Sequence, residues 1–497
     1  MAPCPPTALP ARPEVIVRVR TKWPGAHPAR AVSGAPDGGS AQPSRRLPVY
    51  RAPVFLRQLE PRTARTTAEV FNFALWPFAI LTVLHQVIVK GTNFSITDDF
   101  APVYKASLAF LNGRAIYGEN FDLVDPHYLY PPSGTLLIAP LALIDPEKSR
   151  WCFIALNAVA IILAWYLLLR LFKFSTKSVA APLLLLLMFA SETVINTLGF
   201  GNVNGCLLLG EVLFIHLLLQ RRDLLAGLVM GLTIAVKPTL APMLLIPLAR
   251  RQWQVFITAI GVPVVLMAVA WPLTKDPMDF VHRTLPYLLK SRDYFNSAIV
   301  GNAEYYGLPV WLTWSMRIVL GVLVLLSLWL LYRYCRDDEL FFVCTTAGII
   351  LIASWLLSGL GQQYYSMMLF PFLMTVVLRN SVLRNWPAWL AIFGFMTYDK
   401  WLLDHWQSTG RALEYLRVTF GWALLLIVTF CVLGDRYLAA RREGRLDSGI
   451  EPAFLLPEAT AKPAVTTDPA PRIERHEPAP DDDTMEPMAQ PEAGALR

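Results

Sequence analysis

The chain has 497 residues, of which 55% are apolar or aromatic and only 16% are charged. Soluble domains carry about 25% charged residues, and here the missing charges coincide with long apolar runs, which excludes a string of soluble domains. The net charge of +7 is no argument for nucleic-acid binding, because the cytoplasmic loops of membrane proteins supply an excess of Lys and Arg. The composition predicts a polytopic, all-α integral membrane protein.

The two ends of the chain differ from its hydrophobic middle. Residues 1–69 hold 12 of the 39 prolines and 11 Lys or Arg against 4 Asp or Glu, while residues 447–497 hold 9 prolines and the acidic run at 481–483. Both ends lack the apolar density that offsets chain entropy. We therefore predict a disordered basic tail over 1–69, a membrane domain over 70–446 and a disordered acidic tail over 447–497. The six scattered cysteines show no metal-ligand spacing, so no zinc site is expected.

Apolar runs of the length needed to cross a bilayer, about 20 residues, recur throughout the middle of the chain. They cover 70–89, 151–172, 178–198, 203–219, 254–272, 309–332, 340–358, 362–378, 386–403 and 413–438. Two further regions resist this count: 130–146, which is entered through two prolines, and 224–249, which Lys237-Pro238 interrupts. Each is a short span, a broken helix or a re-entrant pair. We expect 11 to 13 spans, with short interfacial helices in the first outer loop.

The basic residues indicate the orientation. Arginines stand at alternate ends of successive runs and mark the cytoplasmic face; they are Arg221, Arg222, Arg250, Arg251, Arg333, Arg336, Arg379, Arg384, Arg441 and Arg442. Both termini are then cytoplasmic, and Lys173 and Lys177 also fall inside if 130–146 does not cross fully. The two largest interhelical loops, 91–130 and 273–308, lie together on the outer face, where we expect the chemistry.

The first outer loop carries a carboxylate pair, Asp98 and Asp99, before a segment with helical spacing. A carboxylate held at the membrane surface suits general-base catalysis, and the like charge beside it raises one pKa toward neutral. A structural interpretation is an Asp N-cap on the helix, with Thr97 or Asp98 accepting hydrogen bonds from free backbone N–H groups. The spacing alone favours the cap.

The segment D-P-H-Y-L-Y-P-P-S-G forms a polar loop at the membrane interface. Tyr128 and Tyr130 fit an aromatic belt, or they stack on a sugar while His127 hydrogen-bonds to it. Lys237, at the break of an apolar run, is costly there unless it snorkels or pairs, and such a residue is a functional candidate. It either snorkels or contacts a lipid phosphate.

The second outer loop is unusually basic for its side of the membrane. It contains His282, Arg283, Lys290 and Arg292, which call for an anionic partner: the phosphate of a lipid donor or anionic headgroups. Asn296 and Asn302 follow as neutral hydrogen-bonding groups that suit a sugar. Polar residues within spans most often serve interhelical hydrogen bonding. We nevertheless take as further candidates for sugar or acceptor binding Tyr104, Asn202, Asn204, Trp355 and Gln363.

Several motifs together resemble a known family. The stretches T-D-D-F-A-P-V-Y-K, D-P-H-Y-L-Y-P-P-S-G-T-L-L, R-T-L-P-Y-L-L, D-Y-F-N-S and Y-Y-S-M-M-L-F-P-F-L-M-T-V-V-L resemble the polyprenol-phosphate-dependent membrane glycosyltransferases of actinobacteria. The closer resemblance is to the branching α-(1→3)-arabinofuranosyltransferases of arabinogalactan and lipoarabinomannan synthesis. The likeness runs from about residue 70 to about 455. Related mannosyltransferases often have a His in the late span where this chain has Gln362-Gln363.

The resemblance implies a GT-C fold with an extracytoplasmic active site in the plasma membrane, and a catalytic Asp that matches Asp99, with Asp98 beside it. The implied donor is decaprenyl-phosphoryl-β-D-arabinofuranose, and the implied acceptor is a growing arabinan. A polyprenyl phosphate leaves as a stabilised anion, so one base and nearby cations suffice for an inverting transfer. No cofactor is expected; Asp98 and Asp99 could ligate a divalent metal, but the reaction does not require one.

Two other functions remain open. A mannosyltransferase of the same fold would use polyprenyl-phosphate mannose, and the residues alone do not separate a furanose from a pyranose. A lipid-linked sugar flippase or transporter would have a similar number of spans, but it should show an inverted repeat and charges near the bilayer midplane. No such repeat is visible, and most candidate charges cluster on the outer side. A non-catalytic scaffold is disfavoured by the cost of so many polar groups in and beside spans.

Overall fold

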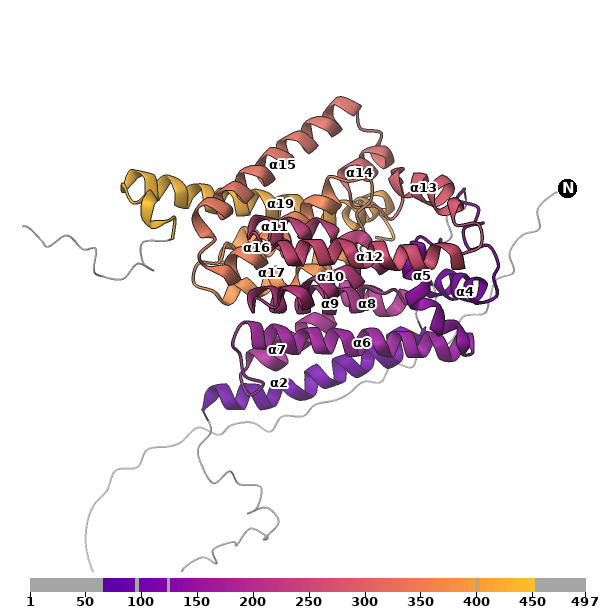
Figure 1. The fold of residues 1–497 in the computed structure, drawn as a ribbon. Coiled ribbons are helices and arrows are strands. Elements are labelled where there is room, and N and C mark those ends of the chain that lie inside the picture. Colours follow the sequence, from indigo (N-terminus) through magenta and orange to yellow (C-terminus); the bar gives the residue numbers. More distant parts are fainter. Residues whose placement is uncertain (1–65, 94–97, 123–125, 399–400, 402, 452–497) are drawn as a thin grey trace, which may run out of the picture. The chain divides into compact units, whose positions relative to one another are not determined.

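The computed structural model describes residues 66–93, 98–122, 126–398, 401 and 403–451 (Figure 1). Within these ranges the regular elements are all helical, apart from one isolated β-bridge between Ala115 and Lys275. The all-α prediction is confirmed. The disordered tails predicted for either end lie outside the described residues, except for 66–69, where the first helix begins, and 447–451.

The first half of the described chain contains short and long helices in alternation. In chain order they are α2 (Thr67–Leu84), η1 (His85–Lys90), α3 (Gly91–Asn93), α4 (Phe100–Leu111), α5 (Pro132–Ile138), η2 (Ala139–Leu143), α6 (Pro146–Leu171), α7 (Ala180–Ala190), α8 (Glu192–Phe200), α9 (Asn204–Leu219), α10 (Asp223–Val236), η3 (Pro238–Leu244) and α11 (Leu245–Ala249). The second half continues with α12 (Trp253–Leu273), η4 (Phe280–Thr284), α13 (Leu285–Leu289), α14 (Ile299–Tyr306), α15 (Val310–Leu330), η5 (Leu331–Cys335), α16 (Glu339–Leu356), η6 (Gln363–Leu369), α17 (Phe370–Met374), η7 (Thr375–Val377), α18 (Trp386–Met396), α19 (Gln407–Arg442) and η8 (Leu446–Ser448).

Six helices in the described ranges are long and apolar enough to cross a membrane, or seven if α7 and α8, bent by 56° at Ser191, form one span. The remaining apolar runs form shorter helices. Several predicted spans agree closely with the helices formed, because apolar length is a local property of the sequence. The expected total of 11 to 13 crossings stays a prediction.

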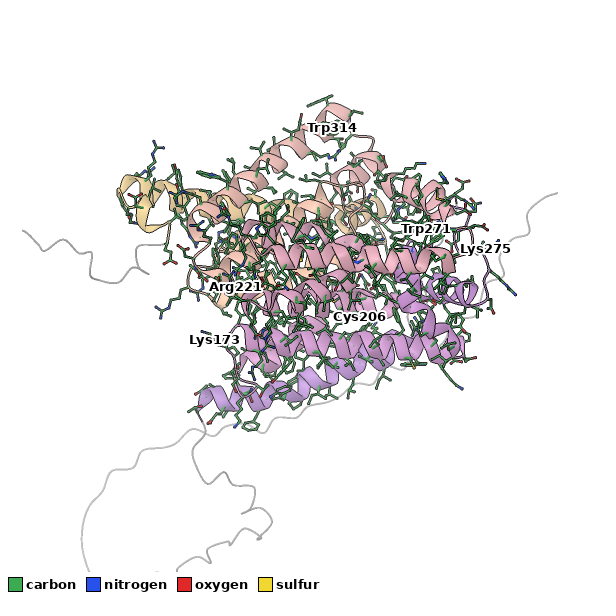
Figure 2. The ribbon with its side chains drawn as sticks, viewed as in Figure 1. Lys173, Cys206, Arg221, Trp271, Lys275 and Trp314 are labelled. Atoms are coloured by element: carbon green, nitrogen blue, oxygen red, sulfur yellow. The ribbon has the colours of Figure 1, made fainter. Side chains whose placement is uncertain are left out.

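The helices of residues 66–451 run between two ends. Figure 2 shows Lys173 and Arg221 toward one end and Trp271 and Lys275 toward the other. We call these the Arg221 end and the Lys275 end. The Arg221 end gathers the arginine-rich turns that the sequence assigned to one face, and the Lys275 end gathers the loops between α2 and α6 and between α12 and α15.

Residues 130–146 fold back on the first outer loop. Helices α5 and η2 pack against α4, and the Tyr104 hydroxyl donates to the Ile144 carbonyl at 2.9 Å. Ser149, in the first turn of α6, donates through its hydroxyl to the Leu141 carbonyl at 2.7 Å. The segment therefore begins and ends at the Lys275 end. This favours a segment that does not cross the membrane.

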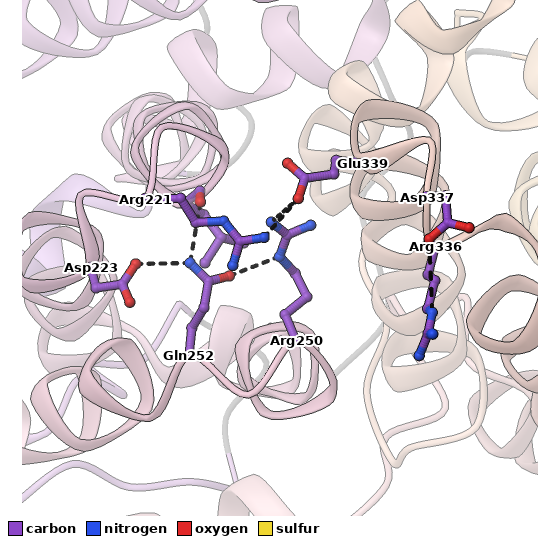
Figure 3. Close-up of polar contacts among 8 residues, drawn as sticks. Arg221, Asp223, Arg250, Gln252, Arg336, Asp337 and Glu339 are labelled. Carbon is purple, nitrogen blue, oxygen red and sulfur yellow. Dashed lines mark hydrogen bonds and ion pairs between the residues drawn. The ribbon is translucent and has the colours of Figure 1, made fainter.

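Residues 224–249 enter the bundle and return to the end from which they came. The turns before and after this segment meet at the Arg221 end, where Arg221 and Arg250 both donate to Glu339 Oε1, at 2.7 and 2.9 Å (Figure 3). Gln252 joins the cluster by accepting from Arg250 Nε at 2.7 Å and donating to Asp223 Oδ1 at 2.8 Å. The break at Lys237 is thus the tip of a re-entrant pair, carried into the interior by α10.

The last helices pack closely through glycine. A Cβ added to Gly394 on α18 would lie 2.8 Å from the Arg417 carbonyl oxygen, and one added to Gly421 on α19 would lie 2.6 Å from the Ala391 carbonyl oxygen. Small residues allow helix backbones to approach in membrane bundles, where dispersion contacts drive packing. Beside this contact, the buried Trp422 indole donates to the Ser366 hydroxyl at 2.9 Å.

Candidate active site

Asp99 is held by the end of a distant helix. Its backbone N–H donates to the Phe200 carbonyl at 2.8 Å, which joins the start of α4 to the end of α8. Gly201, with φ of +66°, ends α8, and a Cβ there would lie 3.0 Å from the Phe100 Cβ. Glycine adopts this left-handed conformation at little cost. The close approach therefore depends on a residue without a side chain.

Asp98 and Asp99 have different surroundings. Asp98 Oδ1 accepts from the Phe100 N–H at 3.1 Å and lies 3.5 Å from Arg150 Nε, whereas Asp99 lines a cavity. Arg150 also donates to the Gly91 carbonyl at 2.8 Å and the Gly199 carbonyl at 3.0 Å. One guanidinium therefore joins three chain segments around the carboxylate pair.

The cavity has a volume of about 420 Å³ and collects side chains from distant parts of the chain. Cavities of roughly 300–1,000 Å³ hold small organic ligands. The residues proposed from sequence that line it are Asp99, His127, Tyr128, Tyr130, Asn202, Lys237, Arg292, Asn296 and Gln363. Polar residues beside them that were not proposed from the sequence are Asn196, Thr239, Tyr294, Ser297, Gln362, Tyr364, Tyr365 and Glu414.

Lys237 reaches this cavity from the tip of the re-entrant pair. Its Nζ lies 3.4 Å from Asn204 Oδ1 and 4.9 Å from the centre of the Tyr365 ring. The start of α5 fixes the backbone nearby: the Ser133 hydroxyl donates to the Ala235 carbonyl at 2.8 Å, and Gly134 packs directly on the Val236 carbonyl. An ammonium group over an aromatic face gains cation–π attraction, which offsets part of the cost of burying the charge of Lys237.

The pKa of Asp99 is raised to about 6, chiefly by burial. The charge of Lys237 and a hydrogen bond with Asn202 lower this pKa, the charge of Asp98 raises it, and the charge of Arg292 lowers it. Removing a carboxylate from water disfavours its charged form, whereas adjacent cations favour it. A carboxylate with a pKa near 6 is ionised at neutral pH and takes up a proton more readily than an ordinary Asp. This is the property of an effective general base.

An aromatic group holds Arg292 at the wall of the cavity. Its Nη1 donates to the Tyr287 hydroxyl at 3.2 Å, and the guanidinium lies 5.4 and 5.7 Å from the centres of the Tyr287 and Tyr294 rings. Tyr287 is itself stacked on Phe121 at 4.3 Å. The contact joins the two largest loops at the Lys275 end, so a cation from one loop faces the carboxylate of the other.

The other aromatic wall comes from residues 126–131. His127 Nδ1 lies 3.2 Å from Glu119 Oε2, and the same oxygen accepts from the Tyr128 N–H at 3.0 Å. The Tyr128 and Thr135 hydroxyls are hydrogen-bonded at 2.7 Å. These bonds orient the rings along the cavity.

Some proposed residues stand behind the lining. Asn204 supports Lys237, and Trp355 lies 5.8 Å, centre to centre, from the Tyr365 ring. The Tyr104 hydroxyl is directed to the Ile144 carbonyl, and Asn302 donates to the Thr419 hydroxyl at 2.6 Å. Although Asn296 lines the cavity, its amide bonds to four backbone groups, those of Arg292, Ala298, Gly359 and Gly361.

Three of the basic residues in the second loop do not line the cavity. His282, Arg283 and Lys290 are exposed, and Arg283 donates to the Glu119 carbonyl at 2.9 Å. Arg292 alone of the four proposed cations in this loop reaches the lining. The sequence did not separate them, because all four lie close together in one loop whose path is set by contacts with the first loop.

Arg150 is one of the residues that sequence reasoning missed. A signal was present, because an arginine at the outer end of a predicted span opposes the positive-inside distribution. Tyr364 and Tyr365 had no such signal in the sequence, apart from their position next to Gln363. No group of three or more His, Cys, Asp or Glu positioned to hold a metal ion occurs among the described residues.

Residues 128–359 match the model of glycosyltransferase family 87. The alpha-(1->3)-arabinofuranosyltransferase of Mycolicibacterium smegmatis is 57% identical over 413 residues, which cover 82% of this chain and 96% of that protein. The protein of the same name from Mycobacterium tuberculosis is 57% identical over 408 residues, 81% of this chain and 94% of its own length. That from Corynebacterium glutamicum is 40% identical over 371 residues, 74% and 88% of the two chains.

The chain belongs to glycosyltransferase family 87. No solved structure matches it. This family-87 enzyme is a multi-pass membrane glycosyltransferase, and its reaction takes a sugar donor and an acceptor. The matched region includes most of the cavity lining, and the longer similarity to the mycobacterial proteins extends over about four-fifths of the chain.

Proposed function

We propose that this family-87 enzyme adds an α-(1→3)-linked arabinofuranosyl branch to cell-wall arabinan from decaprenyl-phosphoryl-β-D-arabinofuranose. The names of the relatives support the sugar and the linkage. The observation that carries the proposal is the cavity, in which Asp99 is accompanied by Lys237 and Arg292. Transfer from a sugar phosphate to a hydroxyl group needs one base and a cationic environment for the departing phosphate.

The reaction is a single displacement. Asp99 takes the proton of the acceptor 3-hydroxyl, whose oxygen forms a bond to C1 of the donor. The bond between C1 and the phosphate oxygen breaks, and the electron pair leaves on the polyprenyl phosphate. Attack opposite the phosphate converts the β donor into an α product. Lys237 and Arg292 stabilise the charge that develops on the leaving group.

A metal ion is not required for this step. The polyprenyl phosphate is already a stable anion, and two cationic side chains line the cavity in which it would depart. Asp98, the neighbour that would complete a metal-binding pair, is engaged with Arg150 and with the Phe100 N–H. We therefore propose catalysis without a cofactor.

We place the reaction on the extracytoplasmic face of the plasma membrane, with both termini in the cytoplasm. The arginine-rich turns lie at the Arg221 end, and the loops that form the cavity walls lie at the Lys275 end. Positive residues concentrate on the cytoplasmic side of membrane proteins. This orientation exposes the cavity to an acceptor that lies outside the cell.

The test is to supply the purified full chain, in lipid, with decaprenyl-phosphoryl-arabinose or a polyprenyl-phosphate mannose, together with an arabinan acceptor. The expected product is an α-(1→3) arabinofuranosyl branch, formed equally well with and without EDTA. Transfer of mannose in its place would assign the mannosyltransferase alternative, and movement of lipid-linked sugar across the bilayer without transfer would assign a flippase. The Asp99→Asn variant serves as the inactive control.

A further inference from the structure

A buried asparagine joins two loops beside the catalytic cavity. The first loop, residues 290–298, runs from α13 to α14, and the second, residues 357–362, runs from α16 to η6. Both loops contribute side chains to the cavity lining, among them Arg292 of the first. We call them the Arg292 loop and the Gly361 loop. Asn296, which is 3% exposed, belongs to the Arg292 loop and contacts both.

The side-chain amide of Asn296 uses its whole hydrogen-bonding capacity on the backbone. Its Nδ2 donates to the Arg292 carbonyl at 2.9 Å and to the Gly359 carbonyl at 2.8 Å. Its Oδ1 accepts from the Ala298 N–H at 3.0 Å and from the Gly361 N–H at 2.9 Å. A primary amide offers two N–H donors and two acceptor lone pairs. All four are occupied, so none is left for a sugar hydroxyl.

Glycine allows the close packing around this amide. A Cβ added to Gly301 on α14 would lie 2.3 Å from Asn296 Nδ2, and one added to Gly361 would lie 2.7 Å from the Trp355 carbonyl oxygen. The Ser297 N–H donates to the Gly361 carbonyl at 2.6 Å, directly beside the amide. The side chain of Asn296 is therefore enclosed by its own loop, by the Gly361 loop and by α14.

The Arg292 loop is held in a strained conformation. Phe295 has a φ of +46°, in the left-handed region that costs free energy for a residue with a bulky side chain. Such a conformation persists only where the surrounding structure determines it. Asn296 bonds to the backbone on both sides of Phe295, at the Arg292 carbonyl and the Ala298 N–H. These bonds account for the persistence of the strained turn.

The same bonds control where Arg292 stands. Its guanidinium reaches the cavity wall between Tyr287 and Tyr294, while its backbone carbonyl is held by Asn296. Because the carbonyl and the guanidinium belong to one residue, a shift of the loop backbone moves the cation. A displacement of about 1 Å is enough to impair a site whose charges must be placed in advance.

We propose that Asn296 is a positioning residue for Arg292, and that it fixes the loop backbone so that the guanidinium meets the phosphate of the lipid donor. This inference rests on the proposed function, because that function supplies the phosphate. The sequence suggested that Asn296 binds a sugar. Its amide instead belongs to the wall of the cavity, and its effect on the reaction passes through Arg292.

Decaprenyl phosphate separates the two roles, because it has the phosphate of the donor and no sugar. Its binding is measured on the full chain in lipid nanodiscs. Arg292→Ala should raise its Kd about tenfold to a hundredfold, the magnitude of a lost charged hydrogen bond, and Asn296→Ala should raise it about three- to tenfold. The double variant Arg292→Ala/Asn296→Ala should bind no more weakly than Arg292→Ala, because the positioned cation is already gone. The acceptor KM of Asn296→Ala should equal that of wild type.

A second variant disturbs the amide without removing it. Gly301→Ala places a methyl group against Asn296 Nδ2 and should also weaken the binding of decaprenyl phosphate, which keeps the test open if Asn296→Ala does not fold. The matched control is Asn380→Ala. Asn380 is a buried asparagine that donates to Asp338 Oδ2 at 2.9 Å, outside the cavity lining. Its loss should lower Tm and leave the binding of decaprenyl phosphate unchanged.

The outcomes distinguish this proposal from the proposed reaction. If the variants weaken the binding of decaprenyl phosphate as expected while no arabinose is transferred, the proposed function fails and Asn296 stands as the residue that positions a phosphate-binding arginine. A loss confined to the sugar-bearing donor would make Asn296 a sugar ligand and overturn the proposal. Additive losses in the double variant, unchanged binding in Arg292→Ala, or an equal loss in Asn380→Ala would also overturn it.

Discussion

Two adjacent carboxylates acquire different properties through their partners. Asp98 faces Arg150 and the Phe100 N–H, whereas Asp99 faces the cavity and two cations. The sequence left a base and a helix cap as alternatives for this pair. In the structure Asp98 accepts from the Phe100 N–H, as the cap requires, and Asp99 lines the cavity. Thr97, the other candidate for the cap, lies outside the described residues. The role of Asp99 as a base stays a prediction.

The pH dependence of transfer should follow Asp99. Because the base acts when ionised, kcat/KM should fall as pH drops through about 6, the value to which burial raises its pKa. Asp99→Asn should lower kcat by about 10²- to 10⁴-fold and remove this limb from any residual rate. A raised carboxylate pKa means that stability present in acid is lost as pH rises through 6. The Asn variant, which keeps this stability, should therefore melt no lower than wild type at pH 7.5.

Arg150 should act on the rate through Asp98 and Asp99. Arg150→Ala leaves the charge of Asp98 uncompensated, so the acidic limb of the pH–rate profile should move to higher pH, and kcat should fall about tenfold to a hundredfold through misplacement of the base. Arg150→Lys keeps the charge and should restore the limb while only partly restoring kcat. A pH profile that is identical in all three proteins would contradict this positioning role.

Lys237 and Lys290 form a matched pair for testing the donor site. Both are lysines proposed from sequence for phosphate binding, but Lys237 lines the cavity and Lys290 is exposed outside it. Lys237→Ala should raise the donor KM and lower kcat, with a smaller effect on the acceptor KM, because it removes a cation from the leaving group. Lys290→Ala should change neither constant. Equal losses in the two variants would argue for a diffuse attraction between the loop and anionic lipid.

At the scale of the elements, the cavity depends on short helices that do not cross the bundle. The re-entrant pair α10 and η3–α11 carries Lys237 inward, and α5 packs against its tip. Proline and the residue before it leave the helical conformation at such breaks, and Lys237 is accordingly extended, with φ of −149° and ψ of 114°. The broken pattern in the sequence was therefore informative, although it did not show which end the segment returned to.

The substitution Gly134→Ala tests the contact between α5 and the end of α10. A Cβ at this position would lie 2.8 Å from the Val236 carbonyl oxygen, so Gly134→Ala must push the two segments apart, at a cost of about 1–3 kcal/mol. We expect a lower Tm and a raised donor KM, because Lys237 moves with Val236. Gly118→Ala, in the first outer loop and with open space around its Cβ, is the control and should retain both values.

At the scale of the whole molecule, the described helices divide charge between their two ends. Arg221, Arg250 and Glu339 link three turns at the Arg221 end, away from the loops that surround the cavity. Exposed ion pairs contribute little stability individually, but the Arg250 side chain is only 7% exposed in this cluster. The cluster therefore joins both ends of the re-entrant pair to the start of α16.

The proposed orientation predicts opposite accessibility of two exposed lysines, Lys177 and Lys275. In a chain whose six cysteines are replaced by alanine, Lys275→Cys should react with a membrane-impermeant maleimide added to intact cells. Lys177→Cys should react only after permeabilisation. Labelling is scored by the mass shift of the purified protein, and the reverse pattern would invert the assigned topology.

Much of the fold was predictable because the tendency of a segment to form a membrane helix depends on its own apolar length. The runs predicted at 203–219 and 340–358 correspond to α9, Asn204–Leu219, and α16, Glu339–Leu356. Each of these two runs forms one uninterrupted helix. Helix α18, which begins at Trp386, ends at Met396, whereas the predicted run continued to residue 403. The run predicted at 178–198 bends at Ser191. Packing between helices, which hydropathy does not encode, decides such departures.

The sequence by itself determined that this is a helical membrane protein with its candidate chemistry in two outer loops, and its motifs indicated the glycosyltransferase family. Only the tertiary structure decided that Asp99 faces the cavity, that Lys237 and Arg292 reach it, and that Arg150 lies against Asp98. The physical reason is how far apart in sequence the interacting residues lie. Hydrophobic length and charge bias act within one segment, whereas the setting of a side chain depends on segments that are distant in sequence, as Asp98 is from Arg150.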